Sequence, residues 1–155
     1  MEKRKKYINK KYKIINVKLK MEEETFGLHQ TLDCYKCDED ALDNYEIVSE
    51  FLDTLPEKIK MNKISKPLVI RCGGVSEKDQ GGISGFVMIA ESHISIHTFP
   101  NRRFMTMDVY SCNKFDAERV KEIVTRFFSV GKFEENIIRR GKEFKKLATT
   151  VAERR

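Results

Sequence analysis

Several residue types capable of catalysis gather in one short segment of this chain. Residues 89–97 read IAESHISIH and hold two of the chain's three histidines, a glutamate and two serines. The flanking residues are apolar enough for a buried sheet, where an unpaired polar group costs roughly a few kcal/mol. A hydroxyl beside a carboxylate and two imidazoles is suited to nucleophilic attack and proton transfer.

Three interpretations of this segment compete. In the first, His93, Ser95 and His97 share one face of a strand and point to water. In the second, both histidines bind zinc together with Cys34 and Cys37, whose CxxC spacing suits that metal. Paired histidines of such sites usually lie on a helix, and the chain has no second CxxC. In the third, the segment is a catalytic cluster.

Alternating and apolar runs predict the elements that position this segment. The predicted strands cover residues 25–35, 67–71, 86–90, 94–99, 104–111 and 136–140. Five of the eight glycines fall in residues 73–85, which we expect to be a loop, and residues 100–103 form a turn.

Two amphipathic helices complete the predicted fold. One begins at an N-cap, Asp38, and ends near Pro56, and the other begins at Asp116 and runs through Phe128. Sequential strands joined by tight turns pair antiparallel, so the helices must cover one face of the sheet. The sequence therefore predicts an α/β (α+β) two-layer sandwich, with a mainly antiparallel sheet and two helices on one face.

A hairpin places a thiol beside the central serine. If the turn centres on Asn101 and Arg102, the numbers of paired residues sum to about 203, and Ser92 lies opposite Ser111. Cys112 is then the diagonal neighbour of Ser92. A hydroxyl, a thiol and two imidazoles thus meet at one end of a hairpin, next to the glycine-rich loop, which favours the catalytic interpretation.

Composition and charge limit the classes of protein. The 155 residues fit one domain, no apolar run approaches 18 residues, and the N-terminal segment lacks a hydrophobic signal core, so we expect a cytoplasmic protein. The net charge of +6 is concentrated in residues 1–20, which carry nine basic residues against Glu2. The remaining residues are close to neutral, and we expect the four cysteines to be reduced.

Longer runs of the sequence resemble one family. GISGFVMIAESHISIHTFP, followed by MDVYSC, is similar to the processing and active-site region of prokaryotic S-adenosylmethionine decarboxylase proenzymes. Upstream, FGLHQTLDCYKCDEDALDN resembles the first strand and helix of that family, and the resemblance covers roughly residues 26–141. The AESH-x-x-IH-T core, with a cysteine twenty residues after its serine, is a highly specific pattern.

The resemblance implies a role for five residues. Ser92 matches the serine that attacks the carbonyl of Glu91, which becomes the C-terminus of the shorter product. His97 matches the histidine that accepts the α-proton of Ser92, and Ser84 matches a hydroxyl that assists this processing. Cys112 matches the general acid that donates a proton to the product carbon.

The cofactor implied by the resemblance is a pyruvoyl group made from Ser92. Its ketone forms a Schiff base with a substrate amine and draws off the electrons released with carbon dioxide, as pyridoxal phosphate does elsewhere. For S-adenosylmethionine, the product is the aminopropyl donor of spermidine (polyamine) biosynthesis. A thiol suits the last step because it holds a proton at neutral pH and can still release it.

The resemblance also implies a domain plan and an assembly. Residues 1–20 form a basic extension, residues 21–141 a single decarboxylase domain, and residues 142–155 a charged tail. Self-cleavage yields chains 1–91 and 92–155, and the cleaved protomers form a homodimer with active sites near the dimer contact. We expect no metal, no membrane and no nucleic-acid partner.

The substrate is the part of the function that the resemblance leaves open. Family members stack adenine on an aromatic ring a few residues before the GxSG element, and ungapped counting places Lys78 there. The candidate substrate-binding residues are Phe26, Glu77, Asp79 and Tyr110.

Alternative functions therefore stand beside S-adenosylmethionine decarboxylation. A pyruvoyl-dependent arginine or ornithine decarboxylase of the same superfamily would suit a loop that carries Glu77 and Asp79. This chain could instead be a homologue without decarboxylase activity that regulates an active paralogue. A non-enzymatic domain that binds zinc or nucleic acid, through Cys34, Cys37 and the basic extension, is the other class.

Overall fold

The computed structural model describes residues 25–144, of which residues 27–140 form one compact unit. Phe26 and residues 141–144 belong to a separate unit. The predicted basic extension, residues 1–20, lies outside the described residues, as does the predicted tail after residue 144. Within the part that is described, no helix is long and apolar enough to cross a membrane.

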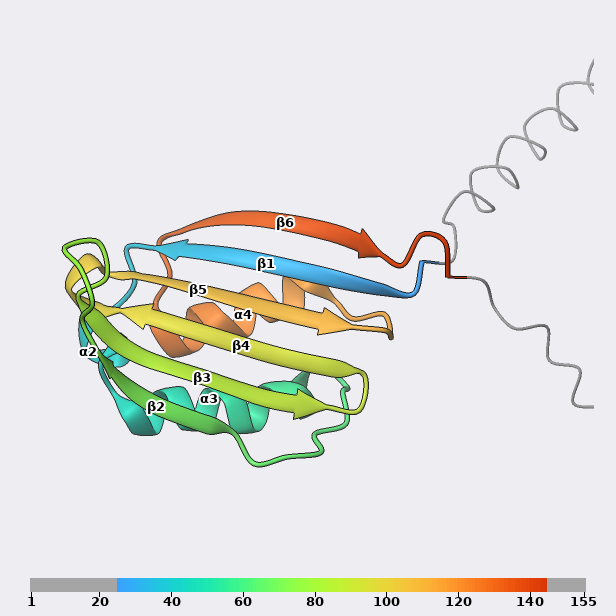
Figure 1. Cartoon of the computed structure of the whole chain (residues 1–155), viewed down its shortest axis with the longest axis horizontal. Coiled ribbons are helices and arrows are strands. Elements are labelled where there is room, and N and C mark those ends of the chain that lie inside the picture. Colours follow the sequence, from blue (N-terminus) through green and yellow to red (C-terminus); the bar gives the residue numbers. More distant parts are fainter. Residues whose placement is uncertain (1–24, 145–155) are drawn as a thin grey trace, which may run out of the picture. The chain divides into compact units, whose positions relative to one another are not determined.

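The compact unit contains six strands, three α-helices and one 3₁₀ turn. In chain order they are β1 (Gly27–Tyr35), α2 (Glu39–Leu42), α3 (Tyr45–Lys58), β2 (Leu68–Gly73), β3 (Gly81–Ile89), β4 (Ser92–Phe99), η1 (Pro100–Arg102), β5 (Phe104–Ser111), α4 (Ala117–Phe128) and β6 (Lys132–Arg140). The strands form one sheet in the order β2-β3-β4-β5-β1-β6, and every neighbouring pair is antiparallel (Figure 1).

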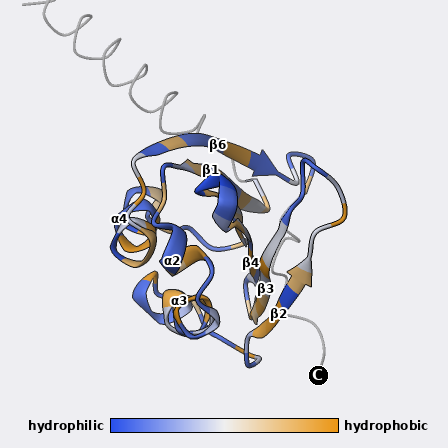
Figure 2. Ribbon diagram, turned by 90° about the vertical axis from the view of Figure 1, so that its left-hand side faces the viewer, coloured by the Kyte–Doolittle hydropathy of each residue, from blue (hydrophilic) through white to orange (hydrophobic). Residues whose placement is uncertain are grey.

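All three helices lie on the same side of the curved sheet (Figure 2). The core between the two layers includes Phe51 and Leu55 of α3 and Ile123 and Phe128 of α4, which are almost fully buried. These side chains meet the apolar residues of one sheet face, which alternate along each strand with residues of the other face. The predicted two-layer α+β fold is confirmed. The side of the sheet opposite these three helices is called here the helix-free face.

The first predicted helix is divided into α2 and α3. Asp38 caps α2 as predicted, but Asn44 starts a new helix because its side chain accepts the backbone N–H of Ile47 at 3.0 Å. Short polar side chains that bond nearby backbone groups favour such breaks. Pro56 lies inside α3 rather than at its end, and its carbonyl accepts the N–H of Met61.

The glycine-rich loop is shorter than predicted. β3 begins at Gly81, where its ladder with β2 pairs Gly81 with Gly73 and Cys72 with Gly82. Glycines have little preference for strands by themselves, so only this cross-strand pairing makes the segment extended. β6 also begins earlier than predicted, at Lys132, because it pairs with the whole length of β1.

Close packing makes Gly82 hard to replace. A Cβ atom at this position would collide with the carbonyl oxygen of Thr98 on β4, whereas a Cβ atom at Gly73 would meet nothing within 4 Å. We expect Gly82→Ala to lower the free energy of unfolding by about 2 kcal/mol, because the backbones must separate. Gly73→Ala is the matched control and should change it by less than about 0.5 kcal/mol. Chemical denaturation measures both, and equal values would contradict the proposed collision.

Candidate active site

The predicted hairpin register is observed. Ser92 pairs with Ser111 across β4 and β5, and the pairs continue to Phe99 and Phe104. The Glu91-Ser92 peptide lies where the two-residue turn after β3 enters β4. Ser92 has a φ angle of 157°, at the edge of the range that residues with a side chain rarely adopt. Such backbone positions cost about 1–3 kcal/mol and are common at reactive sites.

The side chain of Glu91 is anchored below this turn. It is buried and accepts two hydrogen bonds from Asn62, one from the backbone N–H at 3.1 Å and one from the side-chain amide at 2.6 Å. Burial by itself raises the pKa of this carboxyl, but the hydrogen bonds from Asn62 and Asn113 outweigh it and hold the pKa below its usual value. Glu91 is therefore a fixed carboxylate that holds the turn in place.

The carbonyl group between Glu91 and Ser92 is polarised by a backbone donor. The N–H of Cys112 donates to the carbonyl oxygen of Glu91 at 3.0 Å. A donor at this position stabilises the negative charge that develops on the oxygen when a nucleophile attacks the carbon. The thiol of Cys112 is exposed at the same corner.

An imidazole contacts the hydroxyl of Ser92. Ser92 Oγ lies 3.3 Å from Nδ1 of His93, and the His93 ring packs between Phe86 and Tyr110, with centroid distances of 5.5 and 5.7 Å. Burial lowers the pKa of His93, as do the nearby His29 and Arg140, and Asp108 only partly opposes them.

A second polar pair lies further along the helix-free face. Ser84 and His97 are paired residues of β3 and β4, and Ser84 Oγ lies 2.9 Å from Nδ1 of His97. Ser92 and His97 are separated by five residues of extended strand, which span about 16 Å. The structure thus brings Glu91, Ser92 and Cys112 together and keeps the Ser84–His97 pair apart from them.

The helix-free face also carries apolar side chains that none of the described residues covers. Leu68 and Ile70 of β2 and Phe86 and Met88 of β3 are between 39% and 60% exposed. We call these four residues the apolar patch. It adjoins β4, the strand that carries both Ser92 and His97.

The candidate substrate-binding residues fall in different places. Tyr110 contacts His93 and lies under the guanidinium of Arg140, whose carbon is 4.2 Å from the ring centroid. Phe26 belongs to the separate unit. The carbonyl of Glu77 accepts a hydrogen bond from Arg102 at 2.6 Å.

Asp79 lines an apolar cavity. The cavity has a volume of about 320 Å³ and is lined by Lys78, Asp79, Phe99, Arg102 and Phe104. The rings of Phe99 and Phe104 stack with an interplanar angle of 24°. Aromatic rings therefore do stand beside Lys78, but they come from the hairpin of β4 and β5 rather than from the loop.

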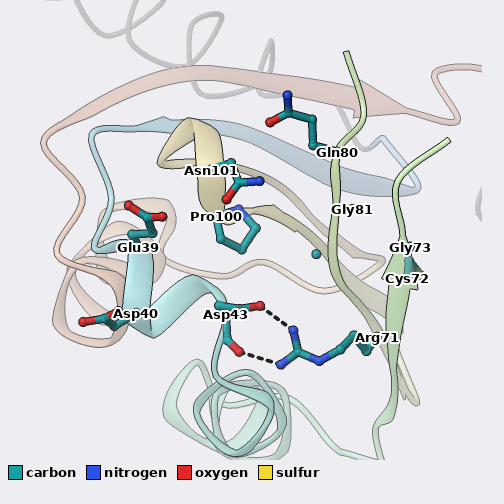
Figure 3. Close-up of a pocket in the computed structure, with 11 residues that line it drawn as sticks. Glu39, Asp40, Asp43, Arg71, Cys72, Gly73, Gln80, Gly81, Pro100 and Asn101 are labelled. Atoms are coloured by element: carbon teal, nitrogen blue, oxygen red, sulfur yellow. Dashed lines mark hydrogen bonds and ion pairs between the residues drawn. The ribbon is translucent and has the colours of Figure 1, made fainter. Parts of the chain in front are cut away.

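A larger, polar cavity of about 480 Å³ opens at the opposite end of β3 from Ser92 (Figure 3). Its walls include Glu39, Asp40 and Asp43, and Arg71 from β2 forms an ion pair with Asp43. Arg71 also donates to the backbone carbonyl of Asp43 at 2.7 Å. Among the described residues that line this cavity, Arg71 is the one cation, and Asp43 already binds it.

The zinc interpretation does not fit the geometry. Cys34 and Cys37 are buried in the core, where burial raises the pKa of both thiols, that of Cys37 to about 11. His93 and His97 lie on the other side of the sheet. Among the described residues, no group of three or more histidine, cysteine or acidic side chains could hold a metal ion.

Two features of the site are not found by the sequence analysis. Asn62 is 29 residues from the glutamate that it holds, and nothing in its neighbourhood marks it. The donor at Cys112 is a backbone group, which carries no side-chain signal. An imidazole close to Ser92, by contrast, follows from the predicted hairpin, and the imidazole that contacts the hydroxyl is that of His93.

Comparisons with known proteins agree on one family. The sequence profile described as S-adenosylmethionine decarboxylase matches residues 28–141. A protein of Clostridium botulinum (strain Loch Maree / Type A3) named S-adenosylmethionine decarboxylase proenzyme is 32% identical over 117 residues, which are 75% of this chain and 95% of the relative. The proenzyme of the same name from Aquifex aeolicus (strain VF5) is 37% identical over 89 residues, which are 57% of this chain and 61% of that relative, so the match spans about three fifths of its length.

A solved structure extends the likeness to three dimensions. The crystal structure of the adenosylmethionine decarboxylase from Aquifex aeolicus VF5 superposes with a TM-score of 0.63 and 30% sequence identity. The superposition covers 77% of this chain and 93% of that chain.

Proposed function

The chain belongs to the S-adenosylmethionine decarboxylase family, and on this premise we propose that it is a proenzyme that cuts itself between Glu91 and Ser92 and then decarboxylates S-adenosylmethionine. The observation that carries the proposal is the geometry of this peptide bond. Its carbonyl oxygen accepts the N–H of Cys112, and the hydroxyl that would attack it contacts an imidazole. This arrangement supports both nucleophilic attack and stabilisation of the oxyanion.

Self-cleavage proceeds through an ester between the two residues. Ser92 Oγ attacks the carbonyl carbon of Glu91, and the C–N bond breaks, which transfers the acyl group from nitrogen to oxygen. A base then removes the α-proton of Ser92, and the Glu91 carboxylate leaves by β-elimination. Addition of water and loss of ammonia convert the remaining enamine to a ketone. The anchored Glu91 side chain holds the leaving group in place throughout.

The residues around Ser92 fit the pyruvoyl group that this sequence of steps makes. That group supplies a ketone that condenses with the substrate amine and accepts the electrons released with carbon dioxide. The exposed Cys112 thiol lies at the same corner, where it would return a proton to the product carbon.

We further propose that the Ser84–His97 pair acts on Ser92 of a second copy of the chain. Within one copy, about 16 Å of strand separates His97 from Ser92, so His97 cannot remove the α-proton of its own serine. A sheet face with exposed apolar side chains requires another layer, and the apolar patch lies beside β4. In a dimer with a twofold contact through the helix-free face, each copy would offer its Ser84–His97 pair to the Ser92 of the other copy.

The cavity beside Lys78 supports a nucleoside as substrate. Phe99, which lines it, lies seven strand residues from Ser92, about 23 Å, so this cavity, like His97, would serve the Ser92 of a second copy. Phe99 and Phe104 offer the aromatic surface that the loop itself lacks, and Asp79 offers a negative charge to a sulfonium centre. An arginine or ornithine side chain has no aromatic base to stack on these rings, although its cation could still lie over a ring face. The product of the proposed reaction is an aminopropyl donor, which fits polyamine biosynthesis.

One experiment tests both parts of the proposal. Intact mass of the purified protein should show chains 1–91 and 92–155, the second resistant to Edman sequencing because its amino group is lost. Carbon dioxide release is then measured with S-adenosylmethionine, arginine and ornithine offered separately, and we expect release from the first alone. A stable uncut chain would refute self-cleavage, whereas a cut chain that decarboxylates only arginine or ornithine would refute the substrate.

A further inference from the structure

We propose that His93 is the general base of the first step of self-cleavage, taking the proton from Ser92 Oγ as that oxygen attacks Glu91. This inference rests on the proposed function, since it names the residue that starts the cleavage. The role differs from that of His97, which the family resemblance places in the later elimination step.

Within one copy of the chain, the distances leave one histidine for this role. His93 Nδ1 lies 3.3 Å from Ser92 Oγ, within reach of proton transfer after a small adjustment. His97 is about 16 Å away along the strand and bonded to Ser84, and His29 on β1 bonds Asp108 at 3.2 Å. These are all three histidines of the chain.

The surroundings of His93 keep its ring fixed and neutral. Phe86 and Tyr110 hold the ring on two sides, which limits the positions that Nδ1 can take. The charged or titratable groups facing it are His29 on β1, Asp108 on β5 and Arg140 on β6. Burial, His29 and Arg140 keep the pKa of His93 below its usual value against the opposing effect of Asp108, so at neutral pH its nitrogen can accept a proton.

The proton and electrons balance without any further reactant. As the bond from Ser92 Oγ to the Glu91 carbon forms, the hydroxyl proton moves to His93 Nδ1. The carbonyl electrons move to the oxygen that the Cys112 N–H holds. When the intermediate collapses, the C–N bond breaks, and the imidazolium returns the same proton to the nitrogen of Ser92. The products are an ester and a free amine.

The test follows ester formation separately from cleavage. The full chain is made by cell-free translation, and hydroxylamine, which cleaves esters, is added at intervals before intact mass is measured. We expect His93→Gln and His93→Phe to slow ester formation about 100-fold or more, the usual contribution of a general base. His93→Phe keeps a ring between Phe86 and Tyr110, so it separates packing from proton transfer. In His93→Ala, added imidazole should restore part of the rate.

The pH profile and a matched control complete the test. Ester formation in the unaltered chain should fall at acidic pH, at a lower pH than an ordinary imidazole would give, because a protonated imidazole cannot accept a proton, and this fall should be absent in His93→Gln. His29→Gln removes a ring that packs on the same Tyr110 but touches no atom of the Glu91-Ser92 bond. At about pH 8, where an imidazole is neutral without help from its neighbours, its rate should match that of the unaltered chain.

Two results would overturn the inference while the proposed function stands. Ester formation at the unaltered rate in both His93→Gln and His93→Phe would show that another group takes the proton. Normal formation of an ester that then accumulates would assign His93 to the elimination step instead. Failure of the unaltered chain to form an ester would refute the proposed function itself.

Discussion

Ser92→Ala is expected to leave a single uncut chain of 155 residues, with no detectable decarboxylation of any substrate. The substitution removes the one atom that attacks the Glu91 carbonyl, and it also removes the oxygen through which elimination proceeds. The hydroxyl of Ser111, which is paired opposite Ser92, cannot replace it, because Ser111 is fully buried and its hydroxyl donates to Met61 Sδ. Intact mass after prolonged incubation measures the result.

Cys112→Ala is the matched comparison at the same corner. The hydrogen bond to the Glu91 carbonyl comes from the backbone N–H of residue 112, which alanine retains. Chain cleavage should therefore continue, while carbon dioxide release falls about 100-fold or more because the proton donor is lost. Cleavage in Ser92→Ala would contradict the assigned nucleophile. Loss of cleavage in Cys112→Ala would show that the thiol itself takes part in processing.

The parts of the fold that the sequence predicts well are those with a local physical cause. Residues 104–111 alternate strictly, and the turn after Phe99 leaves little freedom, so the pairing of Ser92 with Ser111 follows from the sequence alone. Asp38 and Asp116 cap helices through contacts that span two or three residues. The predicted strand boundaries are wrong where a conformation depends on residues far away in the sequence. Gly81 is an example, because its strand conformation depends on its pairing with β2.

The candidate site also has parts that the sequence predicts and parts that it does not. Its residue types can be recognised because they are crowded into one segment and resemble a family, but residue types alone do not show which side chains can reach Ser92. A strand rises about 3.3 Å per residue, which places His97 far from the serine that it was expected to serve. Whether the Ser84–His97 pair completes the site of a second copy depends on how two copies meet at the helix-free face. The order of residues along the chain contains no direct signal for such a contact.

Co-production of two defective chains gives the sharpest test of a site shared between copies. Chains carrying Ser92→Ala or His97→Ala should each fail to complete cleavage when produced alone. In a mixed dimer, the His97→Ala chain keeps its Ser92 and receives an intact His97 from the other copy. If the two chains pair at random, we expect roughly half of the His97→Ala chains to be cut, because half of them have a Ser92→Ala partner.

The same mixture distinguishes a shared site from a site within one copy. If His97 acted on its own chain, neither variant would hold a complete set of groups, and no cleavage would appear in any mixture. Tags of different mass identify which chain is cut, and the Ser92→Ala chain should never be. The control replaces the Ser92→Ala chain with one that also carries His97→Ala, which should remove the rescue completely. The double variant differs from the Ser92→Ala chain only in lacking the His97 imidazole. Cleavage of the His97→Ala chain in its presence would therefore contradict a role for His97 across the contact.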